Sequence, residues 1–231
     1  MGIIGIGIFF MILSWAISSR LKKKFRKYSV TPLSKGLSGA EVAKLMLADH
    51  GIHDVKVMSV AGELTDHYNP VNKTINLSEP VFLGRNAAAT AVAAHETGHA
   101  VQHARAYSML EVRSMLVPVQ NASARIMNII FMAMLFGGFM LPSLIPWNLA
   151  LLIIIGCYTI FTLFAFITLP VEFNASNRAL AWVKERGIVT HSEHEMAKDA
   201  LKWAAMTYVV AAIGSLVTLI YYVMMFLGGD D

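Results

Sequence analysis

The sequence predicts a mostly helical membrane protein with about four transmembrane helices and a cytoplasmic part that contains a small β-hairpin. Hydrophobic residues make up 56% of the 231 residues and charged residues only 15%, whereas soluble domains average about 45–50% and about 25%. Much of the apolar excess lies in uninterrupted blocks that a soluble core does not require. The single cysteine, Cys157, lies inside one such block, which excludes a disulfide-stapled secreted module.

Four apolar runs approach the roughly 20 residues that a bilayer-spanning helix needs, and the first run is the shortest. A cleaved signal peptide is the alternative for that first run. However, a signal peptide carries its positive charge before the apolar segment, whereas here the basic residues follow it. We therefore expect a retained anchor. The expected spans cover residues 3–18, 126–145, 147–169 and 204–227.

The basic residues predict the orientation in the cell membrane. All 19 Lys and Arg residues fall in two segments, 20–125 and 170–203. Because basic residues near membrane ends stay in the cytoplasm, both segments are expected there, with both termini outside. The basic run that follows the first span is a topogenic signal with affinity for the lipid bilayer, and nucleic-acid binding is not expected. The predicted parts are an anchor (1–19), a cytoplasmic region (20–125), a transmembrane hairpin (126–169), a cytoplasmic helical segment (170–203) and a last transmembrane helix with an external tail (204–231).

Local patterns predict the elements of the first cytoplasmic region. Ser38 and Glu41 form an S-x-x-E capping box that opens a helix ending near Gly51. Alternating apolar residues predict strands over 55–60, 64–68 and 74–77, and the last two are joined as a hairpin by the turn at 69–73. The alanine-rich segment 86–107 has a strong helix propensity.

The alanine-rich helix contains the sequence His95-Glu96-Thr97-Gly98-His99. An H-E-x-x-H pattern on a helix places two imidazoles one turn apart on one face, so that both can bind one Zn²⁺ ion, and it places the glutamate close to the water that reacts. The preceding alanines keep this face narrow enough for another helix or a substrate to approach. The pattern therefore predicts a zinc site with Glu96 as general base and acid.

A catalytic zinc site needs a third protein ligand. His103 is a poor candidate because it lies about 12 Å along the helix from His95 at 1.5 Å per residue. The metzincin pattern would require Gly and His where Gln102 and Arg105 stand. Glu172 is the best-placed candidate, because it follows the third span directly and returns to the cytoplasmic side. Four other glutamates are expected to be solvated surface residues: Glu111, Glu185, Glu193 and Glu195.

Four segments resemble the YugP-like family of neutral zinc metallopeptidases, which are predicted bacterial membrane proteases. The resemblance implies a gluzincin-like zinc site in which His95 and His99 bind zinc, Glu96 is the catalytic acid/base and Glu172 is the third ligand. A more distant similarity is to HtpX-like and CAAX-prenyl proteases, which carry an E-x-x-x-D pattern on a later helix. In this chain the pattern begins at Glu172 and has Ser176 in place of the aspartate. Either Asn174 or Ser176 is therefore expected to orient the histidines. The segments are GLSGAEVAKLML (36–47), DHYNPVNKTINLSEPVF (66–82), AVAAHETGHAVQHA (91–104) and LPVEFNASNRAL (169–180).

The expected activity is hydrolysis of a peptide bond, in soluble peptides or in membrane proteins, at the cytoplasmic membrane surface. The developing oxyanion needs a further donor, for which the sequence offers His67, Tyr68 and Arg178. The hairpin can supply an edge strand for an extended substrate, or it can merely cover the helix. The alternative function is a catalytically silent scaffold stabilised by zinc. A solute carrier is disfavoured because the four spans contain no ionisable Asp, Glu, Lys, Arg or His, and the oligomeric state is not predicted.

Overall fold

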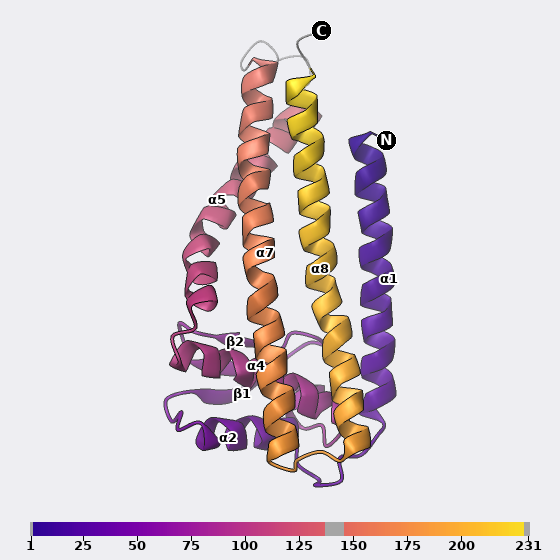
Figure 1. The fold of residues 1–231 in the computed structure, drawn as a ribbon, viewed down its shortest axis with the longest axis vertical. Coiled ribbons are helices and arrows are strands. Elements are labelled where there is room, and N and C mark those ends of the chain that lie inside the picture. The colour runs from indigo at the N-terminus through magenta and orange to yellow at the C-terminus, as the bar shows by residue number, and fades with distance from the viewer. Residues whose placement is uncertain (1, 137–145, 229–231) are drawn as a thin grey trace. The chain divides into compact units, whose positions relative to one another are not determined.

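The computed structural model describes residues 2–136 and 146–228, which belong to two compact units. The apolar unit comprises Met1–Ser14, Val112–Leu169 and Tyr208–Asp231, and the sheet-containing unit comprises Trp15–Glu111 and Pro170–Thr207. Each unit is described separately below. Figure 1 shows the order of the elements along the chain.

Helices dominate the described chain, as predicted. Each expected boundary between a span and a cytoplasmic part falls inside a helix, so the third span and the segment that carries Glu172 form one continuous helix. The helices are α1 (Ile3–Ser29), α2 (Gly39–Asp49), α3 (Glu79–Phe82), α4 (Ala87–Ala104), α5 (Ser108–Phe136), α7 (Trp147–Glu185) and α8 (His191–Leu227).

Three of these helices, α1, α7 and α8, are long and apolar enough to cross a membrane. Four spans were predicted, and the remaining one, 126–145, lies partly in α5 and partly, over 137–145, outside the described residues. Three membrane-length helices are thus established within the described part of the chain, by length and composition.

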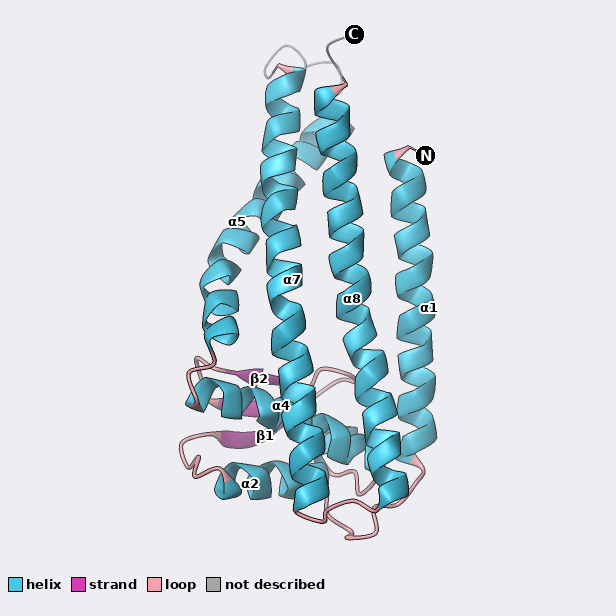
Figure 2. Cartoon of the chain, viewed as in Figure 1, coloured by secondary structure: helices cyan, strands magenta, loops and turns pink. Residues whose placement is uncertain are grey.

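The three strands form a small mixed sheet in the order β1-β3-β2 (Figure 2). The strands are β1 (Lys56–Val60), β2 (His67–Asn69) and β3 (Thr74–Ser78). The expected hairpin is the antiparallel pair β2–β3, whereas β1 pairs in parallel with β3, which was not predicted. The strand expected over 64–68 begins later, because Leu64 has a φ of 57°, which is incompatible with extended backbone.

The helix α4 occupies the centre of the sheet-containing unit, and most of its residues are buried. Asn86 caps it, because the Asn86 side chain accepts a hydrogen bond from the Ala89 N–H at 2.9 Å. The capping box predicted for α2 is also present. Apolar side chains of α2, α3, the sheet and α7 pack with those of α4 in one core, whose fully buried members include Met46, Ile75, Leu77, Val81, Val101 and Val183.

Glu193 was expected to be a solvated surface residue, and this expectation is wrong, because only 4% of the side chain is exposed. Its carboxylate accepts hydrogen bonds from the backbone N–H groups of Thr190, at 2.6 Å, and Ser34, at 2.7 Å. Since Thr190 precedes the first turn of α8, Glu193 both caps that helix and ties it to the loop that follows α1.

Gly98 allows α4 and α7 to approach each other closely. A Cβ atom at this position would lie 2.7 Å from the backbone oxygen of Ala175 in α7. The contact involves backbone atoms, so a larger residue cannot be accommodated by a side-chain rotation. The narrow alanine-rich face of α4 is therefore occupied by another helix, which was one of the two possibilities that the sequence left open.

We predict that Gly98→Ala destabilises the protein by about 1–3 kcal/mol, the usual cost of overpacking. Replacing glycine by alanine inside a helix usually stabilises it, because glycine is about 1 kcal/mol less favourable there. The destabilisation expected here is therefore opposite to the usual effect. The measurement is denaturant or thermal unfolding of the purified protein. Gly156→Ala in α7 is the matched control, because a Cβ atom there meets nothing within 4 Å. A stability gain for Gly98→Ala would contradict the close contact.

Candidate metal centre

Three buried or partly buried side chains meet where α4 lies against α7. His95 and His99 come from adjacent turns of α4, and Glu172 comes from α7. Glu172 Oε2 lies 3.3 Å from His95 Nε2 and 3.6 Å from His99 Nε2. The potential ligand atoms all lie within 4.8 Å of one another, and they form the group of His, Cys, Asp and Glu side chains within the described residues that could hold a metal ion.

The distances fit a metal ion better than a direct hydrogen bond. Ligand atoms bound to Zn²⁺ at about 2.0–2.1 Å in a tetrahedral arrangement lie about 3.3–3.4 Å from one another, close to the two measured separations. Glu172 Oε2 is buried and has no hydrogen-bond partner in the described structure. A buried carboxylate oxygen in this state is costly unless a cation satisfies it. The donor set of two imidazoles and one carboxylate is also one that zinc prefers.

Gln102 fixes the orientation of His99. The Gln102 side chain is completely buried, and its Oε1 lies 3.0 Å from His99 Nδ1. Its Nε2 donates to the backbone oxygen of Val171 at 2.8 Å and to Asn174 Oδ1 at 3.0 Å. Asn174 Oδ1 also accepts from Arg178 Nε, which can only donate. Both partners of the Gln102 nitrogen are oxygen acceptors, so this nitrogen is the NH₂ group and the other terminal atom of the side chain is the carbonyl oxygen. A carbonyl oxygen can only accept, so His99 Nδ1 carries the proton.

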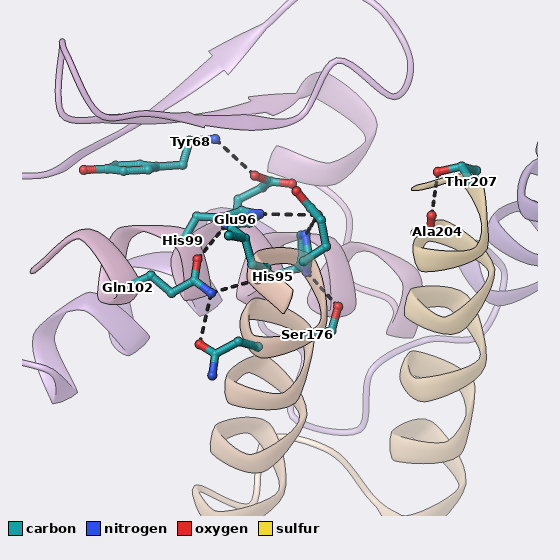
Figure 3. A network of polar contacts seen from close by, with 11 residues as sticks. Tyr68, His95, Glu96, His99, Gln102, Ser176, Ala204 and Thr207 are labelled. Atoms are coloured by element: carbon teal, nitrogen blue, oxygen red, sulfur yellow. Dashed lines mark hydrogen bonds and ion pairs between the residues drawn. The ribbon is translucent and has the colours of Figure 1, made fainter. Parts of the chain in front are cut away.

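Ser176 contacts His95, with its Oγ 3.1 Å from His95 Nδ1 (Figure 3), and its hydroxyl can accept the proton of that nitrogen as well as donate to it. Since a neutral imidazole has one protonated nitrogen, the tautomer that binds a metal through Nε2, with a proton on each Nδ1, leaves a lone pair on each Nε2. Both lone pairs then point toward the carboxylate oxygen of Glu172. Three electron-rich atoms in contact repel one another unless a cation lies between them.

The electrostatics of the cluster show the same need for positive charge. Burial alone would lower the pKa of His99, but the contact with Glu172 and the charges of Glu96 and Glu172 outweigh burial and raise it. Burial alone would raise the pKa of Glu172, but the contacts with the two histidines hold it well below its usual range. A proton on an imidazole is the metal-free substitute for a bound cation.

Glu96 lies beside this cluster and is held by the sheet. Only 8% of the side chain is exposed, and Glu96 Oε2 accepts a hydrogen bond from the backbone N–H of Tyr68 at 3.1 Å. Tyr68 belongs to β2, one of the two edge strands of the sheet, and Figure 3 shows the strand passing over the motif on α4. The free edge of the sheet therefore faces the carboxylate that the sequence predicts to be the general base.

The other predicted residues have partners of their own. His67 is exposed, and its ring contacts the Thr65 backbone oxygen at 2.8 Å and Asn76 Nδ2 at 3.2 Å. His103 Nδ1 lies 2.7 Å from the Tyr68 hydroxyl, outside the metal-ligand cluster. Burial, with a contribution from Asp54, raises the pKa of Tyr68 to about 12, so the phenol stays protonated.

Sequence reasoning considered Gln102 only as a mismatch to the metzincin pattern and missed its contact with His99. The available signal was its spacing, because a residue three positions after a ligand lies on the same face of the helix. Ser176 was one of the two residues considered for orienting the histidines, and it contacts His95. Asn174, the other, acts on His99 only through Gln102. Arg178, a candidate oxyanion donor, directs its Nε to Asn174.

Two comparisons with known proteins gave matches over most of the chain. The profile of a family described as "Putative neutral zinc metallopeptidase" matches residues 3–227. The chain is also 40% identical over 219 residues to the "Putative membrane protease YugP" of Bacillus subtilis (strain 168), and the match covers 95% of this chain and 94% of that protein. No solved structure shows a significant match.

We predict that Gln102→Leu weakens zinc binding about 10- to 100-fold, the usual effect of removing a group that orients a metal-binding histidine. The measurement is the dissociation constant for Zn²⁺, obtained by competition with a chelating dye. Thr97→Val is the matched control, because Thr97 is also completely buried on α4 but its hydroxyl bonds only the Ala93 backbone oxygen. Unchanged zinc affinity in Gln102→Leu, or an equal loss in both variants, would contradict the assigned role.

Proposed function

The chain belongs to this family of neutral zinc metallopeptidases, and from this membership and the local geometry we propose that it is a zinc-dependent endopeptidase. His95, His99 and Glu172 hold the ion, and Glu96 is the catalytic base and acid. The observation that carries the proposal is the convergence of three potential ligand atoms, within 4.8 Å of one another, beside the motif glutamate.

Zinc at this position would supply a Lewis acid that activates water and polarises the carbonyl group of the scissile bond. Glu96 accepts the proton of the attacking water and passes it to the departing amine, a role that typically contributes 10²- to 10⁴-fold in rate. The Tyr68 N–H fixes one carboxylate oxygen of Glu96. The other oxygen has no hydrogen bond to the described residues and is available to the water.

The substrate in this proposal is an extended peptide, in a soluble chain or in a loop of a membrane protein. It would lie along the free edge of β2, where backbone groups other than the Tyr68 N–H, which bonds to Glu96, can bind a further strand. The Tyr68 N–H on this edge bonds to Glu96, and the proximity of the strand to the proposed catalytic base supports the proposal. His67, next along the strand, and Arg178 remain candidates for stabilising the oxyanion.

A catalytically silent scaffold is the alternative. A structural zinc site normally closes with four protein ligands, whereas three are found among the described residues. A structural site also has no need of a buried carboxylate held next to the ion, which is the position of Glu96. Both features favour the enzyme.

We predict that Glu96→Gln retains about one zinc per chain but loses peptide cleavage by at least 10²-fold, because the amide cannot accept the proton of the water. Glu172→Ala should instead lose zinc together with activity, since it removes a ligand. Zinc content and hydrolysis of a fluorogenic peptide or casein would be measured on the same preparations. Equal cleavage by wild type and Glu96→Gln would overturn the proposed chemistry, and full zinc retention in Glu172→Ala would overturn the ligand assignment.

The proposed location is the cytoplasmic face of the cell membrane, with both termini outside. The distribution of the 19 basic residues supports this orientation. A cysteine replacing the exposed Lys35, in a Cys157→Ser background, should react with a membrane-impermeant maleimide only after the cells are opened. Reaction in intact cells would mean that this segment lies outside the cell and would contradict the proposed orientation.

A further inference from the structure

The last two turns of α1 form one wall of a cavity in the sheet-containing unit. The cavity has a volume of about 170 Å³ and is separate from the metal centre. Lys22, Phe25 and Arg26 line it from α1, Leu64 from the loop between β1 and β2, and Asn86 from the start of α4. The side chains of α1 recur at helical spacing, so they form one face of that helix.

Four of the six basic residues of α1 fall into two groups. On the side toward α8, Lys24 forms an ion pair with Asp199 at 2.7 Å, and the Arg20 guanidinium lies over the Trp203 ring at 5.0 Å. On the cavity side, Lys22 and Arg26 form no ion pair within 4.0 Å in the described part of the chain. Glu63, also on the cavity, supplies one negative charge, so two cations face the cavity against one anion.

The sequence of α1 places Lys22 at the depth of lipid headgroups, and Arg26 one turn further from the apolar run on the same face. The apolar run ends at Ser18, and Lys22 follows four residues later, which is about 6 Å along the helix. The polar zone on each side of a bilayer is about 5–8 Å thick. A lipid phosphate at the end of the apolar run can therefore reach the cavity, whose apolar residues Phe25 and Leu64 suit the glycerol and the first acyl carbons.

Two further groups are arranged for a ligand. The Asn86 side chain uses its oxygen to cap α4, which leaves its NH₂ group to donate to an anion. Leu64 has a φ of 57°, a left-handed conformation that leucine rarely adopts and that persists mainly at ligand-binding or functional positions. The strained residue is one that lines the cavity.

We propose that this cavity binds the headgroup of an anionic phospholipid. Lys22, Arg26 and Asn86 bind the phosphate, and Glu63 accepts a hydrogen bond from a headgroup hydroxyl. The proposal is independent of peptidase activity, since it involves none of the residues assigned to the metal or to the reaction. Binding joins α1, the loop between β1 and β2 and the start of α4, so it also stabilises the folded state.

The test uses the full-length protein in a non-ionic detergent, with dihexanoylphosphatidylglycerol as the probe. Native mass spectrometry and the shift in unfolding temperature should report saturable binding of one lipid per chain. Lys22→Ala/Arg26→Ala should weaken binding at least tenfold. Lys23→Ala/Lys27→Ala is the matched control, because it removes the same charge from the same helix but from residues outside the cavity, and it should change binding less than twofold. Equal losses in the two double variants would mean diffuse attraction and would overturn the site.

A second pair of variants probes the cavity wall. Leu64→Asn and Leu64→Asp both suit a left-handed backbone and differ only in charge. The aspartate should weaken binding of the probe at least fivefold more than the asparagine, and equal affinities would overturn the proposal. Dihexanoylphosphatidylcholine and inorganic phosphate are the comparison ligands. Weaker binding of both supports an anionic lipid, whereas binding of inorganic phosphate as tight as that of the lipid would overturn the choice of a membrane ligand.

Discussion

The close approach of α4 to α7 at Gly98 is the constraint on which the metal centre depends. The two histidines belong to α4, but the carboxylate that completes the cluster belongs to α7, more than seventy residues later. A side chain at position 98 would meet the backbone of Ala175, three residues after Glu172. The glycine inside the motif therefore sets the separation at which Glu172 Oε2 can lie 3.3 Å and 3.6 Å from the two imidazoles.

This packing also aligns the groups that orient the ligands. Gln102 on α4 bonds to the backbone oxygen of Val171 and to Asn174 on α7, while Ser176 on α7 bonds to His95 on α4. The hydrogen bonds cross between the helices in both directions. Ser176 of α7 thus holds a ligand of α4, and Gln102, which holds His99 within α4, is itself anchored to α7, so the geometry of the site and the packing of the two helices cannot change independently.

The sequence predicted the parts of the site that depend on local spacing. His95, Glu96 and His99 lie on one helix, and the periodicity of a helix alone determines which side chains share a face. Glu172 required an argument from chain order, and the resemblance to a family supported it. Gln102 shares a face with His99 by spacing, but the acceptors on α7 that fix its amide are not encoded by any local pattern. The parallel pairing of β1 with β3 was missed for the same reason, since the paired residues are eighteen positions apart.

Two predictions were wrong: the surface position of Glu193, which rested on its charge, and the start of the strand at Leu64, which rested on the alternation of apolar residues. Glu193 was expected at the surface because carboxylates are seldom buried without partners, but four donors from Ser34 and Thr190 surround it. The strand expected at 64–68 starts late because of the left-handed backbone at Leu64. In the first case specific hydrogen bonds, and in the second a specific backbone conformation, outweighed a general preference, and neither is visible in composition or periodicity.

The serine at position 176, which stands where the E-x-x-x-D pattern would have its aspartate, is consistent with the charge balance of the centre. Glu96 and Glu172 already place two carboxylates in a largely buried region, and with neutral histidines they are matched by one divalent cation. A third carboxylate beside His95 would leave an uncompensated negative charge, which is costly in a region of low polarity. Ser176 and Gln102 contact the two imidazoles with neutral side chains instead. The histidines are thereby oriented without adding charge, and the negative charge that attracts a cation comes from the two glutamates.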